Sequence, residues 1–503
     1  MPLQTQTATA AQARNYSLKQ YLYGAIFFFF GVFAVLLPWS IKGARYAWIS
    51  AFCIWIVDLA LERKRLRPQP LALPMLAYII FSGLSCVFSY EPYISWPHMK
   101  LVCWTALIAA LFAQNLARLS QVRILVVLLL LSAAAVGGFT AWQYARGIGV
   151  RIVDLVYRSP LHLAGLRPDD ILVAINDRAV HSQADLLKAA PAVPPDATVR
   201  IRFLRGSPIR RKQTFARAGD FLAGNTISPT ITLAKATPLR AEGTLGHYGK
   251  LAEVMAPIAC LAWALMLGTP ARLRRQQLLF AMIFLAITAT VFATQSRSAL
   301  TGLLAGCMIA LLLMSPRRAR LWLVSGLLAV TVGAAFWIQH ARGLKWIDRR
   351  DPGTQYRLLM WQDGARLALR HPLFGVGMDS VQNHWPEWNL RGFAQYRQFW
   401  NFHSDIVQLA AERGLLALAA WLWFVVAYLI YLARLLPRLR ARTQFGWAVA
   451  TGILTGFIAF LFTSLVESSL GNDTLVMLLF FCVGVAIAME RMLEEPEAMK
   501  LSS

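Results

Sequence analysis

Charged residues are scarce in this sequence, which limits the classes of protein to which it can belong. Only 15% of the 503 residues are charged, 57% are hydrophobic, and the mean hydropathy is +0.50. A water-soluble chain of this length needs far more charged surface, so the composition indicates a protein whose solvent is largely lipid. The formal net charge of +25 does not indicate nucleic-acid binding, because much of the basic charge lies in short clusters between apolar runs.

Cysteine patterns and metal-ligand motifs are also missing. The six cysteines all fall inside apolar segments, and no pair has the spacing of metal ligands, so we expect neither a disulfide framework nor a zinc site. The His-Glu-x-x-His pattern of intramembrane metalloproteases is absent, and its nearest approach, His384-Trp385-Pro386-Glu387, lies in a loop rich in Trp and Pro. The first apolar run lacks a small-residue cleavage pattern, so we expect it to be retained as a membrane span.

Long apolar runs, in contrast, are abundant. About twelve of them reach the roughly 17–25 residues that a helix needs to cross a bilayer. The predicted fold is therefore an all-α polytopic membrane protein of about twelve transmembrane helices. The predicted spans are residues 20–38, 44–61, 71–89, 99–117, 122–141, 251–268, 276–294, 298–314, 320–338, 405–433, 445–464 and 473–490.

The distribution of Lys and Arg predicts the orientation of these spans. Short loops at residues 90–98 and 463–472 carry almost no basic charge, whereas the loops on the opposite face are basic. The positive-inside rule then places both termini in the cytoplasm and the loops that lack basic charge on the extracytoplasmic side. The basic loops are residues 62–67, 272–275, 316–320 and 434–442.

Two loops, at roughly 142–250 and 339–404, are too long to be simple connectors, and both fall on the extracytoplasmic side. Loops of this length are usually functional. The sequence therefore divides into alternating membrane and periplasmic parts. These are residues 1–141 with five spans, 142–239 as a periplasmic insert, 240–338 with four spans, 339–404 as a periplasmic catalytic loop, and 405–503 with three spans and a cytoplasmic tail.

The first long loop contains short segments that alternate with period two, which indicates β-strands. These segments are residues 150–153, 171–175 and 198–204, and a helical stretch at 182–190 lies between the last two. The stretch from Ser159 to Asp177 resembles the bacterial type of PDZ domain, with Asp169 where such domains usually have glycine. The resemblance covers residues 147–217 and implies either binding of an extended peptide or protein partner at a sheet edge or a structural spacer. A carboxylate-binding loop is not recognisable at residues 147–150.

Arginines at the extracytoplasmic ends of the spans are the first candidates for chemistry. Arg297 lies between two apolar runs, where a guanidinium is costly unless it faces a wet cavity, pairs with an anion or extends to the headgroups. Arg240 and Arg357 approach the same membrane face. Planar guanidinium groups bind phosphate oxygens bidentately, so the three can hold a diphosphate without a metal ion. No Asp-x-Asp pair lies in either long loop, so a divalent-metal diphosphate site is not expected there, although scattered acids can still assemble one. The sequence contains no signal for a cofactor, and none is expected.

His403 stands at the start of a span and can take a proton from an attacking hydroxyl, although a lone histidine there is also typical of a membrane interface. Asp405 is unsuited to orient the His403 ring, because residues two apart on a helix point in different directions. Glu412 is a carboxylate farther along the same span, where burying an acid that has no function is costly. Arg357 either assists in binding the substrate or pairs with Asp363 or Glu412.

Taken together, these segments resemble the O-antigen ligase and O-antigen polymerase family of bacterial inner membranes. The most specific matches are the Ser-Arg-Ser junction around Arg297, residues 356–361 followed by His-Pro-Leu-Phe-Gly-Val-Gly at 371–377, and His403 with Glu-Arg-Gly at 412–414. Ser404 and Tyr248-Gly249 depart from the family pattern, and a PDZ insertion is not a usual family feature.

The resemblance implies a metal-independent transfer of a glycan from undecaprenyl diphosphate to an acceptor hydroxyl. It implies that Arg240 and Arg297 stabilise the diphosphate and that His403 acts as general base or positions the acceptor. Arg357, Glu412 and His247 are the residues expected in substrate binding.

The acceptor remains open among lipid A core, a growing glycan and a protein hydroxyl, the last making the chain a protein O-oligosaccharyltransferase. A flippase or transporter of lipid-linked sugars is the alternative from another class, although such proteins usually carry broken helices or charges deep in several spans. A scaffold that acts through the PDZ-like domain alone is a third reading.

Overall fold

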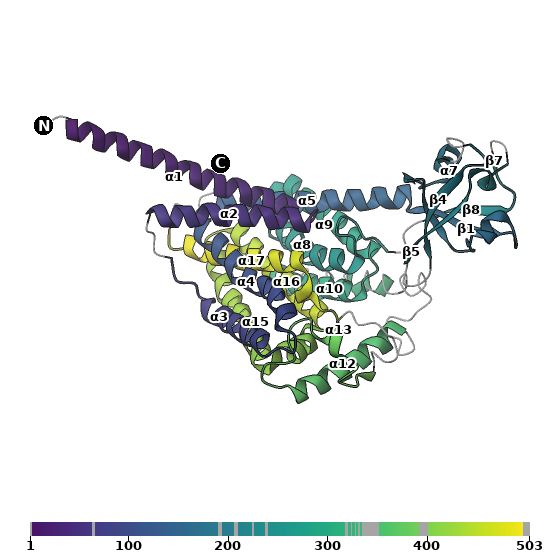
Figure 1. Cartoon of the computed structure of the whole chain (residues 1–503). Helices are drawn as coiled ribbons and strands as arrows, with labels where there is room; N and C mark the ends of the chain where they lie inside the picture. Colours follow the sequence, from purple (N-terminus) through teal and green to yellow (C-terminus); the bar gives the residue numbers. More distant parts are fainter. Residues whose placement is uncertain are drawn as a thin grey trace. The chain divides into compact units, whose positions relative to one another are not determined.

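The computed structural model describes two compact units. One consists of residues 1–137 and 244–503 and is helical, and the other consists of residues 138–243. The described residues are 3–62, 66–189, 194–205, 210–223, 226–236, 240–316, 320–322, 324–326, 328–329, 332–333, 336, 352–391 and 401–495. Figure 1 shows their helices and strands.

The helical unit contains, among the described residues, ten helices that are long and apolar enough to cross a membrane. Their bounds agree with the predicted spans to within a few residues at most ends. A further apolar helix, α3 (Ala72–Val87), has 16 residues, and the predicted span at 320–338 lies largely outside the described residues. The ten are α1 (Leu3–Leu36), α2 (Ile41–Glu62), α4 (Pro92–Asn115), α5 (Leu119–Arg146), α8 (Tyr248–Gly268), α9 (Arg274–Ala293), α10 (Arg297–Met314), α15 (Asp405–Arg440), α16 (Gln444–Ser464) and α17 (Asp473–Met492).

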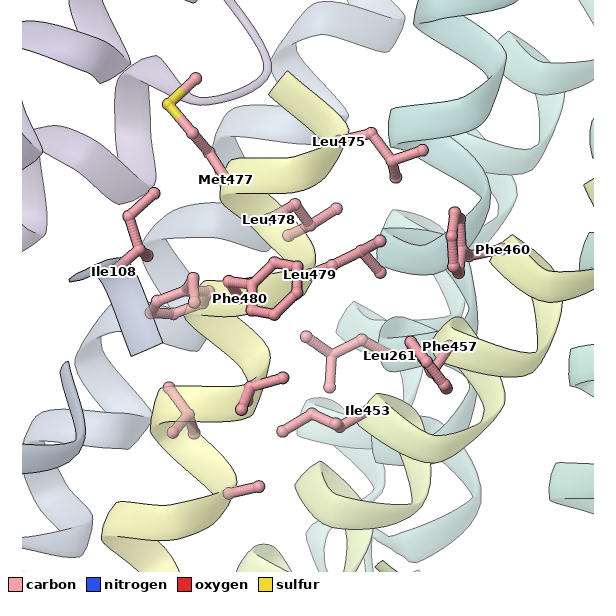
Figure 2. Packing of buried hydrophobic residues seen from close by; sticks show 14 of the residues in the cluster. Ile108, Leu261, Ile453, Phe457, Phe460, Leu475, Met477, Leu478, Leu479 and Phe480 are labelled. Atoms are coloured by element: carbon pink, nitrogen blue, oxygen red, sulfur yellow. The ribbon is translucent and has the colours of Figure 1, made fainter. Parts of the chain in front are cut away.

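Three helices, α8, α16 and α17, form the centre of the helical unit. Between 72% and 83% of their apolar windows is buried inside the protein, whereas α1 and α9 bury only 22%. Apolar surface that the protein leaves uncovered is stable only in lipid, so this contrast separates inner from lipid-facing helices. Figure 2 shows α17 packing between Ile108 of α4 on one side and Leu261 and Phe457 on the other. The chain is therefore a multi-pass membrane protein, as predicted.

The second unit is an antiparallel sheet with the strand order β5-β4-β2-β1-β8, and β3 pairs with β2. Its buried core, which includes Val150, Leu172, Ile201 and Phe221, shares no residue with the core of the helical unit. The elements are β1 (Gly149–Leu155), α6 (Pro160–Leu163), β2 (Ile171–Ile175), β3 (Arg178–Ala179), α7 (Gln183–Ala189), β4 (Thr198–Arg205), β5 (Arg210–Arg217), a β6 (Leu222–Ala223) and β7 (Thr226–Ile227) pair, and β8 (Ile231–Ala236).

The predicted strands at 150–153, 171–175 and 198–204 and the predicted helix at 182–190 are confirmed as β1, β2, β4 and α7. Asp169, which replaces the usual glycine, has a φ of 67°, in the left-handed region that glycine enters without strain. The sequence did not predict β8, which pairs antiparallel with β1 over its whole length. The stretch at 147–150 is hydrogen-bonded to this strand, because the Ile148 amide donates to the Ala236 carbonyl at 2.8 Å.

Candidate functional site

Helix α15 is broken near its start, and the break is held by the His-Pro-Leu-Phe-Gly-Val-Gly turn at residues 371–377. Gly414 has a φ of 81° and a ψ of 171°, which interrupts the helix. The turn supplies the missing hydrogen bonds, with Val376 N donating to Ala411 O at 3.1 Å and Gly377 N to Glu412 O at 2.8 Å. A Cβ at Gly414 would lie 2.2 Å from Leu373 O, so the two segments touch backbone to backbone. This family-like motif is therefore a structural clamp.

Glu412 lies inside this clamp. The residue is 5% exposed, and besides Gly377 its carbonyl also accepts a hydrogen bond from Ser85 Oγ of α3 at 2.9 Å. Its role as a substrate-binding residue stays a prediction.

Helix α12 (Pro352–Arg370) packs directly on the start of α15 and brings Arg357 to His403. Gly364 makes the approach possible, because a Cβ there would lie 2.3 Å from Val407 Cγ1. Trp361 Nε1 donates to the His403 carbonyl at 3.0 Å, and the Tyr356 ring meets the His403 ring edge-on at 5.6 Å. Trp361 thus holds the His403 backbone, which has a φ of 49°, and Tyr356 packs against the imidazole ring.

The centre of the site is a carboxylate that sequence analysis did not single out. Glu467 lies in the loop between α16 and α17, its Oε2 is 3.0 Å from His403 Nδ1, and its Oε1 accepts from an Arg357 Nη at 2.5 Å. The side chains of the three are 21%, 23% and 28% exposed for His403, Glu467 and Arg357, so the triad is partly shielded yet reachable. Arg357 thus pairs with Glu467, while Asp363 pairs with Arg366 at 3.5 Å.

The electrostatics of this triad favour an ionised carboxylate and a basic imidazole nitrogen that faces away from it. Burial alone would raise the pKa of Glu467, but the hydrogen bond from His403 and the positive charge of Arg357 together hold this pKa below its usual value. An ionised Glu467 accepts a hydrogen bond from the Nδ1–H group of His403, and this tautomer leaves the lone pair on Nε2. This arrangement can remove a proton from a hydroxyl at Nε2.

Arg297 begins α10 and lies at the same end of the helical unit as Glu467. Thr463, near the end of α16, donates to the Ser298 carbonyl at 3.4 Å, and Glu467 follows four residues later, just after the helix ends. Arg297 is partly buried, and Ser296 Oγ and Ser298 Oγ beside it are 3.1 Å apart. The structure therefore brings Arg297, Arg357 and His403 to one end of the unit.

His247 and Arg240 are the two remaining candidates. His247 is exposed and caps α8, since its Nδ1 accepts from Gly249 N at 3.1 Å and Lys250 N at 3.4 Å. This contact gives His247 a structural task at the helix start. Arg240 is partly buried and belongs to the unit of residues 138–243. The catalytic role of Arg240 and the substrate-binding role of His247 stay predictions.

Sequence reasoning missed Glu467 because its neighbours in the chain carry no catalytic pattern. In the sequence, the loop at 463–472 is distinguished only by its lack of basic residues. Glu467 lies 64 residues after His403 and 110 after Arg357, so only the fold shows the pairing. The one available signal was an acid in an otherwise uncharged connection between two strongly apolar spans. In the part of the chain that the structure describes, no group of three or more His, Cys, Asp or Glu side chains is arranged to hold a metal ion.

Two family models match parts of the chain. Residues 280–422 match the family model described as O-antigen ligase, and residues 125–213 match the model of the PDZ domain. The first match covers Arg297, Arg357 and His403 but ends before Glu467. The resemblance to the ligase family with an inserted PDZ domain, predicted from the sequence, is confirmed over these ranges. No curated protein matches the chain.

Proposed function

We propose that this chain, which carries an O-antigen ligase family region at residues 280–422, transfers a glycan from undecaprenyl diphosphate to an acceptor hydroxyl. The observation that carries the proposal is the His403–Glu467–Arg357 triad at the end of the unit where α10 begins with Arg297. A carboxylate-oriented imidazole beside arginines supplies a base and an anion-binding group, which are the two parts that this transfer needs.

In the proposed reaction the acceptor oxygen attacks the anomeric carbon of the donor. The bond from that carbon to the diphosphate oxygen breaks, and undecaprenyl diphosphate leaves with the bonding electron pair. The acceptor proton moves to Nε2 of His403. Arg297 and Arg240 stabilise the negative charge that grows on the diphosphate, and Arg357 assists while it holds Glu467.

Three acceptors fit this chemistry: lipid A core, a growing glycan and a protein hydroxyl. We place the ligase or polymerase reaction first and the protein O-oligosaccharyltransferase second. The observation that favours the second is the PDZ domain, because such domains bind extended peptides at a sheet edge and can recruit a protein. We propose a peptide or protein partner for this domain.

The proposed location is the bacterial inner membrane, with both termini cytoplasmic and the site on the periplasmic face. The short basic loops support this orientation, for example residues 272–275 between α8 and α9. Cysteines introduced at Arg275 and at Ser468 are expected to be labelled by a membrane-impermeant reagent only at Ser468 in intact spheroplasts. Labelling of Arg275→Cys alone would reverse the orientation.

The decisive experiment is glycan transfer by the purified protein with a lipid-linked donor, in the presence of EDTA. We expect His403→Ala and Arg297→Ala to lower the rate by at least about 100-fold, the scale on which a general base or a charge-stabilising group acts. His384→Ala and Arg366→Ala are the matched controls, since His384 pairs with Glu387 and Arg366 with Asp363. Loss of activity in EDTA that a divalent ion restores would refute the metal-free mechanism.

The same substitutions separate the enzyme from a flippase. In cells, loss of the enzyme makes lipid-linked donor accumulate on the outer leaflet, whereas loss of a flippase makes it accumulate on the inner leaflet. A scaffold that uses the PDZ domain alone predicts that both substitutions are silent.

A further inference from the structure

The loop between α16 and α17, residues 465–472, carries Glu467 and is tied down at several points. Besides its contacts to His403 and Arg357, Ser468 Oγ lies 3.5 Å from Gln408 Oε1 of α15. A short 3-10 turn, Ser469–Gly471, follows, and Asn472 caps α17. The loop therefore has a defined conformation, and the groups that fix it determine where Glu467 lies.

The first of these groups is Glu253 in α8. Its residue is 8% exposed, its Oε1 accepts from Ser469 Oγ at 3.2 Å, and its Oε2 accepts from Asn472 Nδ2 at 2.9 Å. Asn472 Nδ2 also reaches the Lys250 carbonyl at 3.3 Å. Both carboxylate oxygens of this buried acid thus accept hydrogen bonds from the same loop.

The second group is Asp405, the first residue of α15. It is 3% exposed, and its Oδ1 accepts from Leu470 N at 3.0 Å. Asp405 follows His403 by two residues, so it connects the loop to the segment that carries the imidazole.

Acids buried in a membrane protein are costly and are retained when they serve a function. The side-chain hydrogen bonds described for Glu253 and Asp405 go to the loop that carries Glu467. We propose that Glu253 and Asp405 are positioning residues, which hold residues 465–472 so that Glu467 orients His403 and Arg357. This inference rests on the proposed glycan transfer; it adds Glu253 to the site and assigns Asp405 a role that acts through the loop.

The test is a double-mutant cycle measured on glycan transfer by the full-length protein. We expect Glu253→Gln to lower kcat by about tenfold, with the KM for the lipid-linked donor changed by less than about twofold, because His403 loses its orientation while donor contacts remain. In a Glu467→Gln background the same substitution should change kcat by less than about twofold. An equal loss of kcat in both backgrounds would overturn the proposal, since Glu253 would then act independently of Glu467.

Exchanging the two partners provides a rescue. In the double variant Glu253→Gln with Asn472→Asp, the new amide can donate to the new carboxylate, and Asp remains a good N-cap for α17. We expect kcat to return to within about threefold of the wild-type value. If Glu253→Gln alone fails to fold, the exchange variant still tests the proposal. A folded exchange variant without activity contradicts the proposal.

Asp405 is tested by two substitutions that differ in one acceptor. Asp405→Asn keeps an oxygen for Leu470 N and should retain most of kcat, whereas Asp405→Ala should lose it. Equal loss in both would show that the charge matters and not the contact to the loop. Thr474→Val, next to Asn472 and fully buried, is the control for removing a polar group from this region and should leave kcat unchanged. If wild-type protein transfers no glycan at all, the proposed function fails, which is a different result from additivity in the cycle.

Discussion

At the scale of single residues, Glu467 joins His403 and Arg357 into one unit. His403 alone is a histidine at a membrane interface, and Arg357 alone is one of many arginines. Their shared contact with one carboxylate, at 3.0 Å and 2.5 Å, makes them a unit in which the arginine compensates the charge that orients the imidazole. A substitution of any one member should therefore affect the other two.

This unit has a defined pH dependence. Because the folded state holds the pKa of Glu467 below its usual value of about 4.3, its ion pair with Arg357 and its hydrogen bond from His403 stabilise the protein above that pH and lose their effect as the pH falls through the lowered pKa. Glu467→Gln should lower the free energy of unfolding at pH 7 by about 1–3 kcal/mol, and the difference should shrink below about pH 4. Thermal unfolding of the detergent-solubilised protein at several pH values measures this.

Glu387→Gln is the control for that series, since Glu387 is 63% exposed and pairs with the ring of His384. Its effect on unfolding should be within about 0.5 kcal/mol. A Glu467→Gln effect that grows as the pH falls would contradict the assigned ion pairs.

At the scale of elements, the break in α15 joins segments that are distant in the chain. The turn at 371–377 satisfies backbone groups that the break leaves open, and Leu415 N in return donates to the Pro372 carbonyl at 2.7 Å. The clamp sets the direction of the first turns of α15, which carry Asp405, and thereby the position of His403. The glycines of this motif are explained by space and by backbone conformation instead of by contact with substrate.

Gly414→Ala should therefore destabilise the folded protein severely, by at least about 2 kcal/mol, because it adds left-handed strain to a backbone clash. Its Cβ would lie 2.2 Å from Leu373 O, an atom that cannot move without opening the clamp. Gly24→Ala is the control, since a Cβ there meets no atom within 4 Å and alanine favours the helix α1. Unfolding temperatures of the two variants measure the contrast, and equal values would show that the clamp is dispensable.

At the scale of the whole molecule, the two units have separate hydrophobic cores. The sheet unit is entered after α5 and left after β8, and its two ends lie side by side because Gly149 pairs with Ala236. A domain with adjacent ends can be removed without stretching the rest of the chain.

Replacing residues 147–236 by a short Gly/Ser linker should therefore leave the unfolding temperature of the helical unit within a few degrees of the original. Glycan transfer to a small soluble acceptor should persist if the PDZ domain only recruits a partner, and its loss in a folded deletion variant would assign the domain a direct part in the reaction. Size-exclusion chromatography and the transfer assay are the two measurements.

The sequence by itself determined the membrane class, most span boundaries, three strands of the PDZ unit and the ligase-like motifs, because each depends on local hydropathy, periodicity or short spacing. Tertiary structure alone decided the use of those motifs. In the folded protein, residues 371–377 form the clamp on the break in α15. Glu467, an acid beside the ends of two spans, is the partner of His403. Such pairings depend on which helix ends lie together. A contact between residues 64 or 110 positions apart produces no periodic pattern in the sequence.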